Sequence, residues 1–435
     1  MLELNAVIFD MDGLMIDTEP VGKMLVKTSH EKFGYEITED YNCDVFVLNT
    51  CTVTNLSDRK SRQQISKIRS ENSDAIIAVV GCYSQVSPDE IENIEGVNVI
   101  LGTKYRKEIV ELCELAQSSN KIINKVESIG KNREFEELTI NTEHSMTRAY
   151  IKIQEGCSQF CSYCIIPYAR GPIRSRNIRD IVLEAKRLAD NGFKEIVLTG
   201  IHVASYGKDL DNNDIGLIDV IEDIGQIDKI KRIRLSSLEP RIVDKQFLDR
   251  LSKVEQFCDH FHLSLQSGSD SILQSMNRKY DTDLYEKTIN LIREYYPNAA
   301  ITTDIIVGFP GETDEEFEET YNFIKQANYS ELHVFPYSPR KNTPAAKMKD
   351  QVNDQIKHER ANRLLQLSKE LNHEFALKQI GKTLKVLFEK RDGEYLIGHA
   401  GDYLKVKVKT ADNLIGEIVT IKIDKYDEIL EGRVV

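Results

Sequence analysis

The stretch QEGCSQFCSYCIIPYARG, residues 154–171, places three of the chain's eight cysteines within eight positions. Cys157, Cys161 and Cys164 come directly after the apolar run AYIKIQ, which predicts a buried strand. Ligands of parallel α/β folds bind at the carboxyl ends of the strands. Three thiolates in such a loop can hold one cubane [4Fe–4S] cluster and leave its fourth iron open for chemistry. Zinc is the alternative, although zinc commonly takes a fourth protein ligand and a paired CxxC.

Strand and helix patterns alternate on the carboxyl side of this stretch. Amphipathic segments such as DIVLEAKRLADNGF separate six strand candidates, which predicts an α/β fold with a partial (β/α)6 barrel over residues 146–375. The six candidates are AYIKIQ (149–154), EIVLTG (195–200), RIRLSS (232–237), FHLSLQSG (261–268), AITTDIIVGF (300–309) and ELHVFPYS (331–338).

The residues before the stretch predict a separate parallel α/β sheet domain over residues 1–125. Its strand candidates are AVIFD (6–10), VFVLNT (45–50) and AIIAVVGC (75–82), with helical segments over residues 20–33 and 58–70. Polar residues 126–145 are typical of a linker. A long amphipathic helix is expected after residue 347, and residues 376–435 alternate with period two around Gly/Asp turns. The C-terminal pattern predicts a small β-barrel of about five strands.

The composition is that of a globular protein, with 41% hydrophobic and 29% charged residues in a chain of 435. No apolar run approaches the roughly 18 residues of a membrane helix, so no membrane partner is expected. No secretion signal is recognised, and eight cysteines are too few and too unevenly placed for a disulfide framework, which favours the cytoplasm. The net charge of −13 argues against general coating of nucleic acid but leaves room for a local basic patch.

Four further motifs follow the cysteine loop in order: LTGIHVASYG (198–207), LSSLEP (235–240), LSLQSGSDSILQSMNRKY (263–280) and DIIVGFPGET (304–313). With them the chain resembles the radical S-adenosylmethionine (SAM) enzymes, and among these the methylthiotransferases. The resemblance implies that the open iron of the Cys157/Cys161/Cys164 cluster binds SAM, which one electron cleaves to a 5′-deoxyadenosyl radical. The residues of these motifs that the resemblance assigns to cofactor binding are Gly200, Glu239, Gln266 and Gly308.

Two more cysteines follow predicted strands of the N-terminal sheet, Cys51 in LNTCTVTN and Cys82 in VVGCYSQ. Because the carboxyl ends of neighbouring parallel strands converge, these thiols could share a ligand; ordinary buried thiols are the alternative. In the methylthiotransferases, such cysteines hold a second [4Fe–4S] cluster that binds the sulfur to be delivered. That family has a third cysteine after its first strand, in a motif similar to LGCKVN.

This chain departs from the family at that third position. It has AVIFDMDGLMIDTEP (6–20), which resembles the start of haloacid-dehalogenase-like phosphatases as far as FGYEITED (33–40). The resemblance would make Asp10 the nucleophile and Asp12 the general acid beside magnesium, but the downstream lysine and acidic pair of that chemistry are not found. Cys43 begins the strand that Cys51 ends, roughly 26 Å away at about 3.3 Å per residue. The second cluster is therefore expected to be absent, labile, or held by Cys51 and Cys82 with a weaker carboxylate or water.

The C-terminal region resembles a TRAM domain, an RNA-binding module of this family. In YLKVKVK (403–409), Lys405, Lys407 and Lys409 alternate on one strand face, which suits phosphate binding or a lysine-guarded edge strand. After the cysteine loop, Arg170, Arg174 and Arg176 could contact RNA phosphate or SAM, or be ordinary exposed arginines.

Three remaining residues carry weaker signals. His202 follows a strand end and could touch substrate or be structural. Cys113 and Cys258 lie in amphipathic or polar stretches and are interpreted as ordinary thiols.

The resemblance covers roughly residues 44–435, and its members modify an adenosine beside the tRNA anticodon or an aspartate of a small-subunit ribosomal protein. The local sequence is closest to the branch that acts at C2 of N6-threonylcarbamoyladenosine at position 37 of tRNA. The isopentenyladenosine branch, the ribosomal-protein branch, and an RNA-binding protein that cleaves SAM without delivering sulfur remain alternatives. The implied reaction uses two SAM molecules, and its partners are tRNA, a flavodoxin- or ferredoxin-like electron donor and a sulfur donor.

Overall fold

A computed structural model describes residues 43–119, 121–131, 134–136, 147–210 and 215–435, and the backbone alone of residues 5–10 and 36–37. The helix expected over residues 20–33, Asp12 and much of the expected linker lie outside these ranges. The chain forms two compact units. The first unit comprises Met1–Asn141, Glu155–Arg174 and Ser338–Ala346, and the second comprises Thr142–Gln154, Ser175–Tyr337 and Lys347–Val435.

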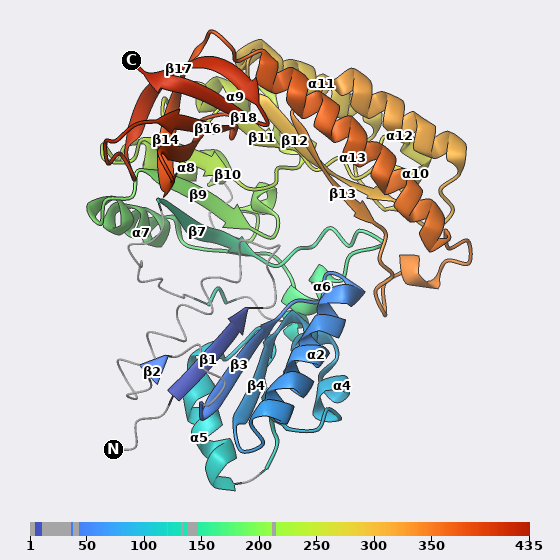
Figure 1. Ribbon diagram of the computed structural model, residues 1–435. Helices are drawn as coiled ribbons and strands as arrows, with labels where there is room; N and C mark the ends of the chain where they lie inside the picture. The colour runs from blue at the N-terminus through green and yellow to red at the C-terminus, as the bar shows by residue number, and fades with distance from the viewer. Residues whose placement is uncertain are drawn as a thin grey trace. The chain divides into compact units, whose positions relative to one another are not determined.

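The first unit contains the predicted parallel sheet, with strand order β2-β1-β3-β4-β5-β6. Figure 1 shows β1, β3 and β4 side by side in this sheet. Its strands are β1 Asn5–Asp10, β2 Glu36–Ile37, β3 Val45–Thr50, β4 Ile76–Gly81, β5 Val97–Ile100 and β6 Ile123–Asn124. The phosphatase-like strand β1 pairs in parallel with β3, with Asp10 opposite Asn49. This segment therefore takes a regular place in the sheet, as the sequence predicts.

Strands β3 and β4 are apolar and fully buried because side chains pack on both faces of this sheet. The helices of the unit are α2 Asn55–Glu71, α3 Cys82–Val86, α4 Pro88–Glu92, η1 Arg106–Glu108, α5 Ile109–Ser119, η2 Ile129–Lys131 and α6 Ile166–Arg170. Helix α2 begins shortly after Cys51, where the Thr54 side chain accepts a hydrogen bond from the Ser57 N–H and caps the helix.

The six predicted strands, β7 and β9 to β13, form a partial barrel of parallel strands. They lie in two sheets with orders β10-β9-β7-β8 and β11-β12-β13, in which the two-residue strand β8 is an addition. Parallel bridges Ile233–Phe257 and Leu238–Leu263 join the β10 and β11 segments. The strands are β7 Arg148–Glu155, β8 Arg174–Ser175, β9 Glu195–Gly200, β10 Arg232–Leu235, β11 His260–His262, β12 Ala300–Val307 and β13 Glu331–Pro336. The helices are α7 Ile178–Asp190, η3 Val203–Ser205, α8 Leu217–Gly225, η4 Pro240–Ile242, α9 Lys245–Leu251, α10 Asp270–Ser275, α11 Thr282–Tyr295, α12 Asp314–Ala327, η5 Ala345–Lys347 and α13 Asp354–Leu377.

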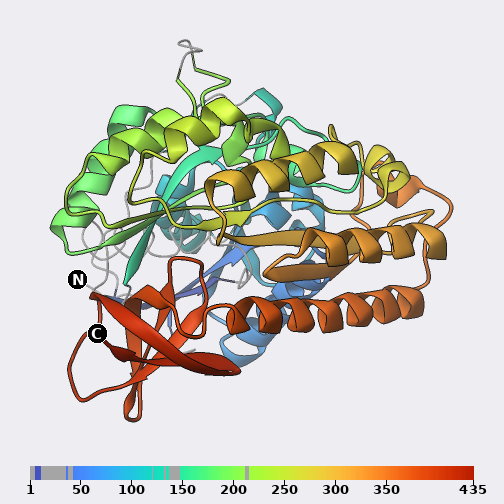
Figure 2. The same cartoon turned by 90° about the horizontal axis from the view of Figure 1, so that it is seen from above.

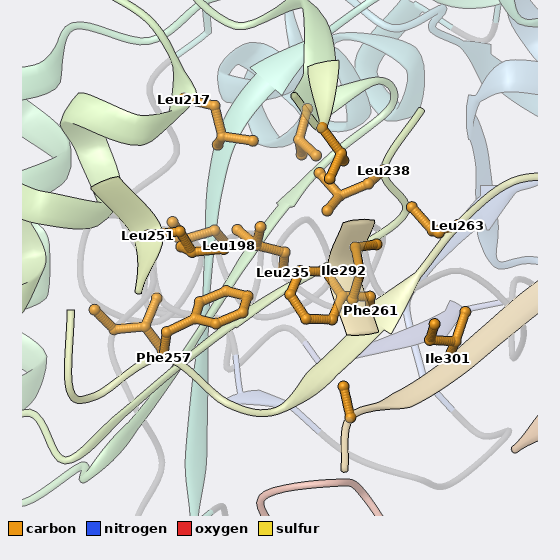
Figure 3. Packing of buried hydrophobic residues seen from close by; sticks show 14 of the residues in the cluster. Leu198, Leu217, Leu235, Leu238, Leu251, Phe257, Phe261, Leu263, Ile292 and Ile301 are labelled. Carbon is orange, nitrogen blue, oxygen red and sulfur yellow. The ribbon is translucent and has the colours of Figure 1, made fainter. Parts of the chain in front are cut away.

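Alternate residues of the barrel strands form one continuous core with the covering helices. Figure 3 shows Leu198, Leu235 and Phe261 of three neighbouring strands packed with side chains of the covering helices, among them Leu251 and Ile292. Burial of these side chains is the main stabilising contribution in this unit. The opposite strand face carries the polar residues, which leaves their chemistry available on one side of the strands.

The C-terminal residues form a closed five-stranded barrel with order β14-β15-β16-β18-β17, and α13 leads into it (Figure 2). Its strands are β14 Thr383–Asp392, β15 Tyr395–Ala400, β16 Lys405–Lys409, β17 Ile418–Asp427 and β18 Ile429–Val434. Strand β16 has hydrogen-bonded neighbours on both sides. The alternative that its lysines guard an exposed edge strand is therefore wrong.

Within the second unit, a buried charge cluster fastens this barrel to the larger one. Glu195 is fully buried and pairs with three arginines of β7 and β10: Arg148, Arg232 and Arg234. Arg234 lies over the ring of Tyr403 at 4.5 Å from its centroid, and Arg148 donates to the Tyr403 hydroxyl at 3.0 Å. The β15–β16 turn is thus held by the amino-terminal ends of the larger barrel's strands.

In the described part of the chain, no helix is both long and apolar enough to span a membrane.

Candidate active site

The cysteine loop, residues 154–171, is closed at its base by backbone contacts. The Cys157 N–H donates to the Gly171 carbonyl at 3.0 Å. Gly156 has φ +72°, and a Cβ at this position would lie 1.9 Å from the Pro172 carbonyl oxygen. Only glycine permits this approach, so the two ends of the loop are fixed against each other.

Cys161 and Cys164 are the ends of one tight turn, and Cys157 precedes it in the same loop. Cys161 is buried, Cys157 and Cys164 are half-buried, and the Cys164 N–H donates to the Cys161 carbonyl at 3.0 Å. Among the residues that the structure describes, no three His, Cys, Asp or Glu side chains are grouped so that they could hold one metal ion. In a cubane cluster, each thiolate binds a different iron atom, so the sulfurs need not meet at one point. Three soft donors in one partly open loop fit such a cluster chemically.

Cys51 and Cys82 follow paired residues at the carboxyl edge of the N-terminal sheet, because Thr50 of β3 lies opposite Gly81 of β4. Both cysteines are buried, and the Val53 N–H donates to the Cys51 sulfur at 3.3 Å. Gly81 has φ +104°, and a Cβ there would lie 2.5 Å from the Thr50 carbonyl oxygen. The sharp exit from β4 therefore requires glycine directly before Cys82.

Sequence reasoning missed how Arg170 and Glu155 are used at this edge. The Arg170 Nε–H donates to the Cys82 sulfur at 3.0 Å, and its Nη1 donates to Glu155 at 2.8 Å. Arg174 pairs with the other Glu155 oxygen at 3.2 Å. One signal in the sequence was available: Glu155 stands at the end of a strand predicted to be buried. Because buried carboxylates are usually paired with a cation, its position predicts a nearby arginine or lysine.

The three arginines proposed for RNA or SAM contact are buried in this structure. Arg170 is 4%, Arg174 1% and Arg176 7% exposed. Arg176 pairs with Glu184 in the second unit, while Arg170 and Arg174 pair with Glu155. The alternative that these arginines are ordinary exposed side chains is therefore wrong.

A second arginine network, also missed from the sequence, surrounds the loop after Cys51. Arg340 comes from the segment Ser338–Ala346 and donates to the Thr52 hydroxyl and the Asp58 carboxylate. The same segment contacts the cysteine loop, because the Ala345 N–H donates to the Ser162 carbonyl at 2.9 Å. One short segment therefore connects both cysteine-bearing regions of the first unit.

In the second unit, the ends of β7, β9 and β10 are joined by a polar chain. The His202 N–H donates to the Gln154 side chain at 2.7 Å, and the His202 ring lies 3.0 Å from Glu239. Gly200 lies opposite Gln154, where a Cβ would be 2.9 Å from the Gln154 carbonyl oxygen. Burial opposes ionisation of Glu239, but hydrogen bonds from His202 and Arg241 outweigh it and lower its pKa to about 2. Glu239 is thus an anion at neutral pH, and His202 has a clear structural contact.

The other two proposed cofactor residues lie at neighbouring strand ends of the same unit. Gln266 is buried with φ 74°, and its N–H donates to the Asp304 carbonyl at 2.9 Å. A positive φ in a glutamine is uncommon and often marks a functional position. The Gly308 N–H donates to the Glu312 carboxylate at 3.0 Å, and its φ of +68° suits glycine.

The lysines of β16 lie on the C-terminal barrel and differ in their partners. Lys407 pairs with Glu431 at 3.5 Å and Lys409 with Glu394 at 2.7 Å, whereas Lys405 is exposed beside them. Carboxylates therefore offset part of the positive charge on this face.

The remaining cysteines fit the interpretation as ordinary thiols. Burial raises the pKa of Cys113 to about 12 and that of Cys258 to about 11, so both stay protonated at neutral pH. Cys43 lies just before the start of β3, at the end of the strand away from Cys51. The sequence has no further cysteine in residues 1–125, so the N-terminal edge has two thiols rather than three.

Comparison with known families covers both cysteine-bearing regions. Residues 151–324 match the Radical SAM superfamily, and residues 17–102 match the Uncharacterized protein family UPF0004. The second match includes Cys51 and Cys82 and begins inside the phosphatase-like stretch.

Curated relatives match over most of the chain. The threonylcarbamoyladenosine tRNA methylthiotransferase MtaB of Bacillus subtilis is 42% identical over 415 residues, 94% of this chain and 91% of its own. The protein of the same name from Aquifex aeolicus is 40% identical over 83% of this chain and 88% of its own. The tRNA-2-methylthio-N(6)-dimethylallyladenosine synthase of Alkaliphilus oremlandii is 36% identical over 94% of this chain and 87% of its own.

Solved structures are similar in fold at low sequence identity. The radical S-adenosylmethionine methyltransferase TsrM from Kitasatospora setae has a TM-score of 0.57 at 16% identity, covering 79% of this chain and 77% of its own. The cobalamin-dependent S-adenosylmethionine radical enzyme OxsB has a TM-score of 0.53 at 12% identity, covering 86% of this chain and 56% of its own. At such identities the likeness supports the fold alone.

Proposed function

Since the chain belongs to the radical SAM methylthiotransferase family, we propose that it adds a methylthio group to C2 of N6-threonylcarbamoyladenosine at position 37 of tRNA. The observation that carries this proposal is the 42% identity, over 94% of the chain, to a threonylcarbamoyladenosine tRNA methylthiotransferase. The dimethylallyladenosine synthases are the second candidate, at 36–38% identity.

Cys157, Cys161 and Cys164 would hold the [4Fe–4S] cluster, and the strand ends carrying Gly200, Glu239, Gln266 and Gly308 would bind SAM. When bound, the cluster and SAM together supply the one-electron chemistry that removes hydrogen from C2 of the adenine. The residues of this chain prepare the site. Gly156 closes the loop that presents the three thiols, and Glu239, ionised at neutral pH, offers a carboxylate to the amino group of SAM.

The N-terminal edge does not fit a cluster held by three cysteines, because the sequence supplies only Cys51 and Cys82 there. We propose that any second cluster is absent, labile, or completed by a weaker oxygen ligand. Anaerobic reconstitution followed by iron and sulfide assays tests this directly. About four irons per chain are expected, or about eight that fall to about four on desalting, since a cluster completed by an oxygen ligand is held weakly. About eight irons that persist after desalting would contradict the proposal.

The missing third thiol favours one further candidate function, an RNA-binding protein that cleaves SAM without delivering sulfur. Two substrate tRNAs, bearing threonylcarbamoyl or isopentenyl at adenosine 37, separate the candidates when nucleosides are measured by mass spectrometry. Methylthio product on the threonylcarbamoyl substrate supports the main proposal, and 5′-deoxyadenosine without methylthio product supports the alternative. The Cys157→Ala variant is the control, since it should form neither compound.

The C-terminal barrel would serve as the TRAM domain that binds tRNA through Lys405, Lys407 and Lys409. The reaction also requires a flavodoxin- or ferredoxin-like electron donor and a sulfur donor, and we place it in the cytoplasm with its tRNA substrate.

A further inference from the structure

We propose that Phe160 and Tyr168 form a stacking platform for an unpaired nucleobase of the tRNA anticodon loop, next to the adenosine that is modified. The inference rests on the proposed function, because it takes tRNA as the substrate. Its basis is a pair of exposed aromatic rings on the loop that carries Cys157, Cys161 and Cys164.

The first observation is where these two rings lie. Phe160 directly precedes Cys161, and Tyr168 lies in α6 near the end of the same loop. Phe160 is 53% and Tyr168 43% exposed, and their ring centroids are 6.1 Å apart with planes at 81°. Single exposed apolar residues are ordinary on protein surfaces, but two exposed rings in contact form a local aromatic surface. In an edge-to-face pair each ring keeps a face on which a flat partner can stack.

The second observation is the backbone of Phe160. Its φ is 49°, in the left-handed region that bulky side chains rarely adopt. Strain of this kind persists where the surrounding structure fixes it, and it is frequent at functional positions. Burial does not offset the strain here, because more than half of the side chain is exposed. A contact with another molecule accounts for an exposed ring held at a strained position.

The third observation is that the loop offers aromatic surface rather than positive charge. Arg170 and Arg174 are buried, and both guanidinium groups pair with Glu155. The exposed part of the loop therefore fits the flat face of a nucleobase better than it fits a phosphate.

A nucleobase is also the group that the proposed reaction brings to this loop. Enzymes that act on a base take it out of the stack, so the base beside it in the RNA loses a stacking partner. Aromatic side chains commonly stack on such bases in single-stranded RNA loops. Because Phe160 is one residue from Cys161, its ring is placed to take the position of the displaced adenosine beside the next base.

Four variants separate a stacking role from a structural one. Phe160→Leu and Tyr168→Leu remove a ring but keep an apolar side chain, whereas Phe160→Tyr keeps the ring. Leu115→Ala is the matched control, because Leu115 is also 53% exposed and lies on α5 of the same unit. Iron content after reconstitution is measured for each variant, and it should equal that of the unsubstituted protein.

The experiment measures binding of a fluorescein-labelled anticodon stem-loop, with threonylcarbamoyladenosine at position 37, by fluorescence anisotropy. Reconstituted full-length protein is used without SAM or reductant, so that a contact of the ring with SAM cannot affect the result. Phe160→Leu and Tyr168→Leu should each weaken binding by about 5- to 150-fold, the range for loss of one base–aromatic stack. Phe160→Tyr and Leu115→Ala should bind within about twofold of the unsubstituted protein. In Phe160→Leu the slope of log affinity against log salt should not change, because stacking releases no counterions.

A second pair of RNAs tests whether ring and base act on each other. In these stem-loops the nucleotide on one side or the other of adenosine 37 is abasic. On one of the two RNAs, Phe160→Leu should cause no further loss of affinity, since the base that the ring contacts is already missing.

The proposal is overturned if Phe160→Leu binds RNA normally, or if Phe160→Tyr binds as weakly as Phe160→Leu. It is also overturned if iron content falls together with affinity, or if the loss of affinity is the same on all three RNAs. The proposed function is tested separately by the methylthio product of the unsubstituted protein. Product together with normal RNA binding by Phe160→Leu contradicts the inference alone. Binding without product contradicts the function, while the ring variants still decide the inference. A stem-loop that the unsubstituted protein does not bind contradicts both.

Discussion

Two buried glutamates, one in each unit, gather arginine side chains in the same way but serve different ends. Glu155 is 1% exposed and pairs with Arg170 and Arg174. Glu195 is fully buried and pairs with the arginines of β7 and β10: Arg148, Arg232 and Arg234. In each case one carboxylate neutralises charge that would otherwise be costly to bury.

The difference lies in where the remaining guanidinium donors go. Around Glu195 they reach the C-terminal barrel: Arg232 donates to the His399 carbonyl at 3.0 Å and Arg234 to the Gly401 carbonyl at 3.2 Å. Around Glu155 one donor reaches the Cys82 sulfur. A buried ion pair thus docks a domain in one place and holds a buried thiol in the other, and the third partner of the arginine distinguishes the two.

The largest expected effect comes from removing either carboxylate. Glu195→Gln and Glu155→Gln each leave buried arginines unpaired, which should lower the free energy of unfolding by about 3–5 kcal/mol. Urea denaturation of metal-free protein measures this loss. Iron content then separates the two sites, because only Glu155→Gln should also weaken the cluster at the cysteine loop.

The control for this pair is Glu255→Gln, an exposed glutamate whose replacement should change stability by less than about 0.5 kcal/mol. If Glu195→Gln reduces the iron content of folded protein as much as Glu155→Gln does, the distinction between a pair that docks a domain and a pair that holds a buried thiol is wrong.

A smaller and more local effect is expected from Gly156→Ala, which acts on the Glu155 side alone. The new Cβ would lie 1.9 Å from the Pro172 carbonyl oxygen, so the base of the cysteine loop must open. Iron bound after reconstitution should fall by at least about half, with a stability loss of about 1–3 kcal/mol. Gly192→Ala is the matched control, since Gly192 has φ +95° with nothing within 4 Å of the added Cβ. Gly192→Ala should lower the stability but leave the bound iron unchanged. Equal iron in the two variants would show that closure of the cysteine loop at Gly156 is not needed for the cluster.

What the sequence predicts well in this protein follows from local rules. Cys157, Cys51 and Cys82 follow apolar strands, and the carboxyl ends of parallel strands are where ligands gather, so their place at strand ends could be read from short windows. The Arg170–Cys82 contact could not, because it joins residues 88 positions apart through side chains. The hydrophobic pattern of a sequence does not predict which arginine of a cluster donates a hydrogen bond to which thiol.

Burial of charge is the second thing that the sequence conceals. In the sequence, Arg170, Arg174 and Arg176 look like solvent-exposed side chains. In the fold all three are buried, because they form ion pairs with Glu155 and Glu184. Strand β16 shows a related limit. Its alternation is visible, but its parallel pairing with β18, which closes the barrel, joins strands that are not consecutive in the chain.

The two thiols beside arginines sharpen the comparison further. Cys258 lies near Arg234, but burial raises its pKa to about 11 and the nearby arginine offsets only part of that shift. A raised pKa stabilises the fold below the ordinary thiol value and loses that contribution as the pH rises through about 11. At pH 8, a shift of this size lowers the thiolate fraction about 100-fold.

Native, metal-free protein should therefore resist alkylation of Cys258 by iodoacetamide at pH 8, by at least about 100-fold relative to protein in urea. Peptide mass spectrometry measures the rate for each cysteine, with Cys113 as the control thiol of the first unit. Rapid labelling of Cys258 in folded protein would show that proximity to arginine, rather than burial, governs these thiols.

The smallest expected effect tests the C-terminal barrel, which the arginines around Glu195 attach to the larger barrel. If the C-terminal barrel binds tRNA, Lys405→Gln should reduce the slope of log affinity against log salt by about one, the contribution of one phosphate contact. Lys409→Gln should reduce it less, because Lys409 must give up Glu394, 2.7 Å away, before it can serve a phosphate. Fluorescence anisotropy of labelled tRNA over a potassium chloride series measures both slopes. Lys405 and Lys409 are both exposed residues of β16, so the difference between their two slopes measures the effect of the carboxylate partner. If neither substitution changes the slope, this face of the barrel does not contact tRNA.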